Sequence, residues 1–200
     1  MNALTLLTND HRRVDRLFTD HAKAAGNARR QKALFDDVRR ELDIHAQIEE
    51  QVFYPALEGP LATPMKERVE EALAEHEEVK ALLTVLVPLA PEDAGYALAF
   101  KKLADAVREH VKEEEAEMFP AAREILGVAR LEELGQEMAD LKPQLAAGIA
   151  EALTSAVKVA RRPVPAPARR RPAKVVTRRA APAAARGRTR VAPKKTRRRK

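Results

Sequence analysis

The sequence contains no cysteine and no tryptophan, and aromatic residues make up only 4% of its 200 positions. Without cysteine there can be no disulfide bond, thiolate–metal site, Fe–S ligation or cysteine nucleophile. No stretch approaches the roughly 20 apolar residues that span a bilayer, so we expect no integral membrane association. The first residues, MNALTLLTNDHRR, lack a basic region followed by an apolar one. We therefore expect no signal peptide and a cytoplasmic location.

Acidic residues are absent from the last part of the chain. Residues 158–200 hold 18 Lys and Arg and no Asp or Glu, whereas residues 1–157 hold 19 Lys and Arg and all 30 acidic residues. The overall charge of +7 therefore combines a body of −11 with a tail of +18. An asymmetry of this kind indicates a polyanionic partner.

Apolar residues recur at steps of three and four along most of residues 3–155, which indicates amphipathic helices. The expected breaks are Gly26–Asn27, Gly59–Pro60, Pro88–Pro91 with Gly95, and Gly127. Thr63–Pro64 and Pro91–Asp93 resemble helix starts, and Pro143 predicts a kink in the last helix. Long helices joined by short turns form antiparallel neighbours. The prediction is an all-α protein: an up-down four-helix bundle in residues 1–127, an additional helix in 128–157, and a tail in 158–200.

The body contains an internal repeat at an offset of 65 residues. DHRRVDRLF (10–18) aligns with EHEEVKALL (75–83), and HAQIEEQVFYPA (45–56) aligns with HVKEEEAEMFPA (110–121). The equivalent polar residues are His11 and His76, His45 and His110, and Glu49 and Glu114. Duplication of a helical hairpin explains the shared apolar residues, but polar residues on the same faces need a further reason.

Each of these six residues takes an apolar position in a stripe that is predicted to be buried. The third stripe, for example, is Val69, Leu73, His76, Val79, Leu83 and Leu86. The midpoints between successive histidines fall on the predicted turns, so all four histidines belong to one layer of the bundle. Because buried carboxylates need a partner, this layer predicts a two-metal site. The alternatives are a hydrogen-bonded core network and an acid–base site. Such ligands suit Fe, Mn, Zn or Cu.

The order H…HxxxE…H…HxxxE, with FYP and MFP after the second and fourth histidines, resembles the hemerythrin-like HHE cation-binding domains over about residues 3–126. The resemblance implies a four-helix bundle around a non-haem di-iron centre, with Mn and Zn as alternatives to iron. It also implies a role in metal binding for each of the six polar residues of the repeat. One iron would take His11 and His45, the other His76 and His110, and Glu49 and Glu114 would bridge.

One position departs from the pattern of the oxygen-carrying hemerythrins, which have a further histidine four residues after the third-helix ligand. Lys80 stands there, which implies a more open position for water, O2, peroxide or NO. Lys80 is expected beside the ligands or in solvent. Tyr54 is expected to fill the core, and it could also hydrogen-bond to the site or pass it an electron. Glu50 and Glu115 lie about 100° off the ligand face and are expected at the surface or beside the ligands, and His21 at the surface.

Residues 158–200 contain six of the thirteen prolines and no aromatic residue, and are predicted to be disordered. Their composition resembles the basic tails of linker histones and of some bacterial nucleoid proteins. Such a tail binds DNA through its phosphates, without reading the base sequence. RNA, polyphosphate, anionic lipid and the acidic body are alternative partners. The candidate nucleic-acid-binding residues are Arg161, Arg162, Arg169, Arg170, Arg171, Lys174, Arg178, Arg179, Arg186, Arg188, Arg190, Lys194, Lys195, Arg197, Arg198, Arg199 and Lys200.

Together these observations predict a non-haem di-iron protein that binds or reacts with O2, peroxide or NO, tethered to DNA in the nucleoid by its tail. Its role would be sensing, detoxification under oxidative stress, or iron handling. Two alternatives are a metal-binding or storage module without turnover, and an architectural nucleoid protein with a structural metal site.

Overall fold

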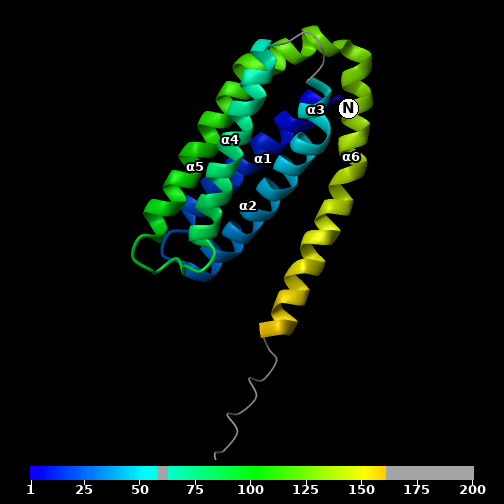
Figure 1. Ribbon diagram of the computed structural model, residues 1–200. Coiled ribbons are helices and arrows are strands. Elements are labelled where there is room, and N and C mark those ends of the chain that lie inside the picture. The colour runs from blue at the N-terminus through cyan, green and yellow to red at the C-terminus, as the bar shows by residue number, and fades with distance from the viewer. Residues whose placement is uncertain (58–62, 161–200) are drawn as a thin grey trace, which may run out of the picture. The chain divides into compact units, whose positions relative to one another are not determined.

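The computed structural model describes residues 1–57 and 63–160, and the tail residues Arg161–Lys200, with every candidate nucleic-acid-binding residue, lie outside the described part. The elements are α1 (Ala3–Lys23), α2 (Ala28–Ile48), the π-helical η1 (Glu49–Phe53), α3 (Tyr54–Leu57), α4 (Thr63–Leu86), α5 (Tyr96–Glu113), the π-helical η2 (Glu114–Met118) and α6 (Phe119–Ala160). Helices α1, α2, α4 and α5 lie side by side as a bundle, and α6 runs along one flank (Figure 1). The predicted all-α four-helix bundle with an additional helix is confirmed.

The first two helices begin at asparagine caps. The Asn2 side chain accepts a hydrogen bond from the Thr5 N–H at 2.9 Å, and Asn27 accepts one from the Arg30 N–H at 3.0 Å. These caps satisfy backbone donors that have no partner inside the helix. The turn between the helices passes through Gly26, whose φ of 83° suits glycine.

The expected start of a helix at Pro91–Asp93 is wrong, because α5 begins at Tyr96. The Asp93 side chain accepts a hydrogen bond from the Ala90 N–H at 2.6 Å, so it closes the preceding turn instead of capping the helix. Gly95 then takes a φ of 93° immediately before the helix. An Asp that caps a helix and an Asp that closes a turn look the same in sequence.

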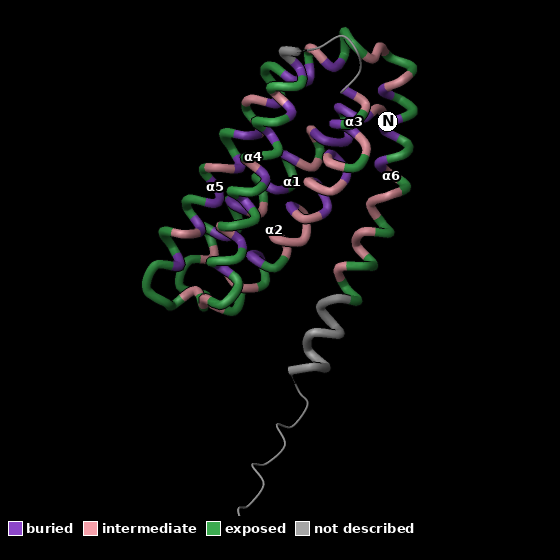
Figure 2. The backbone as a smooth tube through the Cα atoms, in the orientation of Figure 1, coloured by how far each residue is buried: buried purple, intermediate pink, exposed green. Residues whose placement is uncertain are grey.

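The buried residues of the bundle face its axis (Figure 2) and form two apolar clusters, one toward each end. In each of α1, α2, α4 and α5, the histidine of the repeat falls between the residues of the two clusters. One deviation from the predicted stripes occurs at Leu73, which is 36% exposed, while Ala72 takes the core position. Ala72 lies one i,i+4 step before His76, so it shares the face of that histidine more closely.

The expectation that His21 lies at the surface is wrong, because this residue is 4% exposed. Its Nε2 shares a hydrogen bond of 3.0 Å with the Tyr96 hydroxyl, and its ring stacks on Phe100. Burial lowers the pKa of His21, which favours the neutral ring. The fifth histidine is thus a core residue outside the layer of the other four, and its partner is recognisable only once α5 is known to begin at Tyr96.

Helix α6 packs across the start of α1 through Leu131, Leu134 and Met138, which belong to the apolar cluster that contains Leu4 and Leu7. Its backbone departs from helical dihedrals at Gly127, and the helix continues through Pro143, where a kink was expected. Leu141 and Leu145 pack against the cluster on both sides of the proline, and this packing holds the helix through it. No helix among the described residues is long and apolar enough to cross a membrane.

Replacing Gly135 with alanine should destabilise the fold. A Cβ at this position would lie 2.6 Å from Asn2 C and 2.7 Å from Ala3 N, both backbone atoms. We expect a loss of about 1–3 kcal/mol in the free energy of unfolding, measured by urea denaturation. Gly148→Ala is the matched control, because nothing lies within 4 Å of its added Cβ. That variant should be stabilised by up to about 1 kcal/mol, and equal effects of the two variants would contradict the close packing.

Candidate metal centre

The six polar residues of the repeat meet in one buried layer at the centre of the bundle. His11, His45, His76 and His110 come from α1, α2, α4 and α5, and Glu49 and Glu114 are the first residues of η1 and η2. All six side chains are buried, with no more than 6% of any residue exposed. The structure therefore places every predicted ligand position in the predicted layer.

The two carboxylates lie between histidines of different pairs. Glu114 Oε2 is 3.3 Å from His11 Nε2 and 3.6 Å from His110 Nε2. Glu49 Oε2 is 3.3 Å from His45 Nε2 and 3.4 Å from His76 Nε2. Two groups of side chains could each surround a cation, namely His11, His45, Glu49 and Glu114 in the first and Glu49, His76 and His110 in the second. Glu49 belongs to both groups, as a bridging carboxylate must.

Both glutamates begin a π-helical segment, which the repeat and its periodicity do not predict. The Tyr54 N–H donates to the Glu49 carbonyl and the Phe119 N–H to the Glu114 carbonyl, each five residues back. Pro55 and Pro120 follow directly, and because proline has no N–H it interrupts the regular hydrogen-bond pattern. π-Helical turns are frequent at functional sites. The FYP and MFP motifs are therefore the sequence signal for these turns.

Carboxylates on the far side of the rings orient three of the four histidines. His11 Nδ1 contacts Glu115 at 2.8 Å, His76 Nδ1 contacts Glu50 at 2.9 Å, and His110 Nδ1 contacts Glu75 at 2.7 Å. A carboxylate only accepts, so each Nδ1 carries a hydrogen, and each Nε2 faces the centre, where the neutral ring could offer its lone pair to a metal ion. Glu50 and Glu115 thus lie beside the ligands, one of the two alternatives expected.

Asp10 is the carboxylate that faces the fourth histidine, His45, but it does so at a longer distance. Its Oδ2 is 3.8 Å from His45 Nδ1, too far for a hydrogen bond, and Lys142 of α6 holds both of its oxygens at 2.6 and 2.7 Å. Asp10 and Glu75 are functional neighbours that the sequence patterns above did not single out. A signal is present, because each directly precedes the first histidine of its repeat, in DHRR and EHEE.

Glu115→Gln should weaken metal binding without removing a ligand. The amide can no longer act as the charged acceptor for His11 Nδ1, and loss of such a partner typically costs 10–100-fold in metal affinity. We expect a change in this range, measured by competition with a chelator of known affinity. Glu132→Gln is the control, since Glu132 is exposed on α6. An affinity equal to that of the control would show that Glu115 does not support the site.

Tyr54 and Lys80, the two further residues singled out in the sequence, lie on opposite sides of this layer's ligands. Tyr54 is buried in the core and its hydroxyl donates to Glu114 Oε1 at 3.0 Å. Burial, together with Glu49 and Glu114, raises the pKa of Tyr54, which keeps the phenol protonated. Lys80 Nζ donates to Glu50 at 3.0 Å and to Glu77 at 2.9 Å. It therefore reaches the site through Glu50, the carboxylate that orients His76.

The buried layer carries polar atoms that no protein group satisfies. Within the described residues, both oxygens of Glu49, Oε2 of Glu114 and Nε2 of His110 have no hydrogen-bond partner. By contrast, His11 Nε2 and His45 Nε2 lie 3.2 Å apart, within hydrogen-bond distance. The unpartnered buried groups are costly, and a cation bound among them would satisfy them. This donor set fits bound metal ions.

The pKa values of the two buried carboxyl groups also fit bound metal ions. Burial and the neighbouring Glu114 raise the pKa of Glu49. Burial would also raise the pKa of Glu114, but contact with His11 and the charge of His110 lower it. The pKa values of the two carboxyl groups thus shift in opposite directions, as expected when two acidic groups share a buried site. Divalent cations would allow both to ionise.

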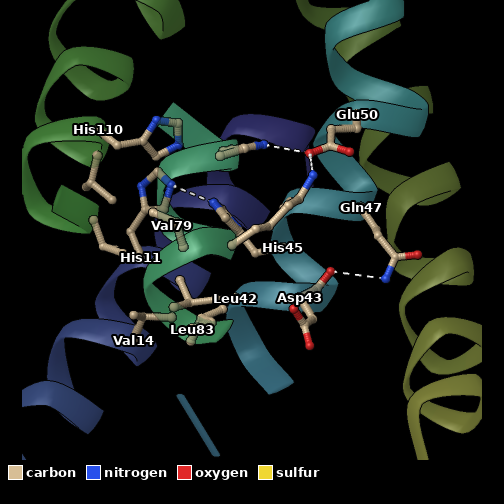
Figure 3. Close-up of a pocket in the computed structure, with 15 residues that line it drawn as sticks. His11, Val14, Leu42, Asp43, His45, Gln47, Glu50, Val79, Leu83 and His110 are labelled. Atoms are coloured by element: carbon tan, nitrogen blue, oxygen red, sulfur yellow. Dashed lines mark hydrogen bonds and ion pairs between the residues drawn. The ribbon is translucent and has the colours of Figure 1, made fainter. Parts of the chain in front are cut away.

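A cavity of about 260 Å³ lies beside the histidines and is lined by all four of them. Its walls are mainly apolar, and Figure 3 shows Val14, Leu42, Val79 and Leu83 around the rings. The polar lining residues are Asp43, Gln47, Glu50 and Lys80, which are half-buried or exposed. The cavity therefore offers space for a small molecule next to the ligand nitrogens.

Comparison with known sequences supports this view of the site. The sequence model of the hemerythrin HHE cation binding domain matches residues 2–122. The chain is 32% identical over 146 residues to the uncharacterised proteins Rv2633c of Mycobacterium tuberculosis and Mb2666c of Mycobacterium bovis, and the alignment covers 72% of this chain and 88% of each relative. It is also 27% identical over 145 residues to a protein of Nostoc sp. named DNA nickase, but it spans only 40% of that relative's length.

A solved structure agrees with the sequence comparisons. The crystal structure of the Rv2633c homologue of Mycobacterium kansasii, a hemerythrin HHE cation binding domain-containing protein, superposes with a TM-score of 0.69 at 32% sequence identity. The match covers 77% of this chain and 93% of the other. The helical bundle thus shares its fold with a solved HHE domain.

Proposed function

The chain belongs to the hemerythrin HHE cation-binding family, and on this basis we propose that its buried layer holds two metal ions, with iron as the resident metal. His11 and His45 would hold one ion, His76 and His110 the other, and Glu49 and Glu114 would bridge them. The observation that carries the proposal is the set of buried ligand atoms without a hydrogen-bond partner. No rearrangement of the bundle is needed to direct them at cations.

Two redox-active ions bound here would supply electrons to a small ligand such as O2, peroxide or NO. The chain contributes the environment for that ligand. The apolar walls of the cavity favour a small neutral molecule over ions, and the cavity adjoins all four histidines. Position 80 provides no fifth imidazole, because a lysine stands there. The Lys80 ammonium group is engaged by Glu50 and Glu77. A coordination position is therefore left for the small ligand.

An optical test separates this function from its alternatives. Iron-loaded protein should show charge-transfer absorption that changes when peroxide or NO is added. The zinc-loaded protein is the control, because zinc has no redox chemistry and no such absorption. Iron-loaded protein whose spectrum does not respond to peroxide, NO or O2 would favour the storage or structural alternatives. Purification with tightly bound zinc would contradict iron as the resident metal.

We further propose that the basic tail tethers this centre to DNA in the nucleoid, within the cytoplasm. The support is the sequence of residues 158–200, whose 18 positive charges are not opposed by any acid. Contacts between many Lys and Arg side chains and phosphates release condensed counterions and bind DNA without sequence preference. The relative from Nostoc is named DNA nickase, and this name describes that protein alone. Metal chemistry would then take place close to the chromosome.

A further inference from the structure

The two halves of the repeat differ in how their glutamates are covered. Around Glu49, Leu6 and Ile48 are buried in the same apolar cluster as Leu131 and Leu134 of α6. At Gly135, helix α6 also lies directly against the backbone of Asn2 and Ala3. Helix α6 thus covers this part of the first half with apolar residues.

At an offset of 65 residues, Leu6 and Ile48 correspond to Glu71 and Glu113. These two acids line a cleft between α4, α5 and η2, together with Arg68, Ala72, Glu75, Glu114 and Met118. The cleft has a volume of about 20 Å³, which is enough for one water molecule or a small cation. Where the first half is apolar and covered, the second half is therefore acidic and open.

The inner end of the cleft is formed by Glu114, which is 2% exposed. Its Oε2 has no hydrogen-bond partner among the described residues. Next to it, Glu75 contacts His110 through one carboxylate oxygen. The cleft thus leads from solvent to Glu114, a carboxylate residue of the buried layer.

The charge of the cleft suits a cation. Within the described part of the chain, neither Glu71 nor Glu113 has a cationic side chain within 4.0 Å, and the cation of Arg68 is held by Glu117. Four carboxylates against one guanidinium group leave the lining with an excess of negative charge, and such a cleft raises the local concentration of cations.

We infer that divalent metal ions reach the buried layer through this acidic cleft, where Glu71 and Glu113 attract the ion and pass it to Glu114. This inference rests on the proposed metal-binding function. It assigns one route to the metal ions and another to the small molecule, because the apolar walls of the 260 Å³ cavity suit neutral molecules and oppose a charged ion. Ion uptake and small-molecule access would then occur at separate surfaces.

The rate of metal uptake by the full chain tests this route. Metal-free protein prepared by chelation is mixed with Co²⁺, and its visible absorption is followed by stopped flow at several ionic strengths. Glu71→Gln combined with Glu113→Gln should load at least about tenfold more slowly, with a weaker dependence on salt. The amount of Co²⁺ bound at completion should be unchanged. Glu71→Lys, which places an ammonium group at the cleft, should slow loading further.

Glu92→Gln combined with Glu132→Gln is the matched control, because it removes the same charge from exposed positions on the 87–95 turn and on α6. Loading of the cleft variant at the rate of this control would overturn the route and leave the acids to another role, such as contact with a basic partner. Lower final Co²⁺ content would also overturn it, because it would make the acids permanent ligands. If the wild-type chain binds no Co²⁺, the proposed function itself fails.

Discussion

Replacing both His45 and His110 with alanine should abolish metal loading. The double change removes one nitrogen ligand from each proposed ion and leaves one histidine on each side, which with shared carboxylates does not complete a coordination sphere. Both side chains are buried, so water cannot fully replace the lost ligands in place. We expect the metal content per chain to fall from two to near zero, measured by elemental analysis after incubation with excess Fe²⁺ under anaerobic conditions.

The control for this variant is His21→Gln. His21 is also a buried histidine, but its partner is Tyr96 at the end of the bundle, so the variant should keep full metal content even if it is less stable. Circular dichroism would establish that both variants remain helical. Unchanged metal content in the folded His45→Ala, His110→Ala protein would refute the assignment of the ligands.

Ending the chain after Ala160, the last residue of α6, should remove the proposed binding to DNA. The remaining body carries a net negative charge, and a phosphate backbone repels it. For the full chain, contacts with about 6–10 phosphates imply a fall in affinity of about 10³–10⁵ between 50 and 200 mM salt. The measurement is a fluorescence anisotropy titration with duplexes of two unrelated sequences, which should bind the full chain equally well.

A full-length control distinguishes charge from chain length. Replacing Arg169–Arg171 and Arg197–Arg199 with glutamine keeps the length and removes six positive charges. This variant should bind DNA with intermediate affinity and a smaller salt dependence. If the chain that ends at Ala160 still binds DNA like the full protein, the tail is not the tether.

The sequence predicts the histidine layer well because the repeat supplies two independent views of the same face. His11 and His76, or Glu49 and Glu114, occupy the same register in two hairpins, and the turns fix their level in the bundle. The bounds of α1 and α2 follow from local signals, as at Asn27, whose side chain caps its helix. These features depend on short-range patterns and on helix periodicity, which a single sequence contains.

The features that the sequence does not predict depend on how neighbouring helices are rotated and where they begin. Asp10 reaches toward His45 of another helix, and its oxygens are fixed by Lys142, which is far away in the sequence. His21 is buried because Tyr96 and Phe100 of α5 cover it. Periodicity places such residues on a face, but it does not say what packs against that face.

The π-helical turns are unpredicted for a different reason. Helix periodicity implies a regular 3.6 residues per turn through Glu49 and Glu114, whereas both residues begin a wider turn. The wider turn shifts the register of the residues after it, and it brings Tyr54 to Glu114 across the bundle. Pro55 and Pro120 mark these positions in the sequence, but the turn itself requires the backbone to be seen.

The number of metal ions bound per chain tests the central claim most directly. Metal-free protein titrated with Fe²⁺ without oxygen, and analysed for iron and protein after gel filtration, should reach two ions per folded chain. This stoichiometry follows from the two groups of ligands that share Glu49, with Glu114 between His11 and His110. A plateau at one ion, or the absence of stable binding, would contradict the two-metal centre.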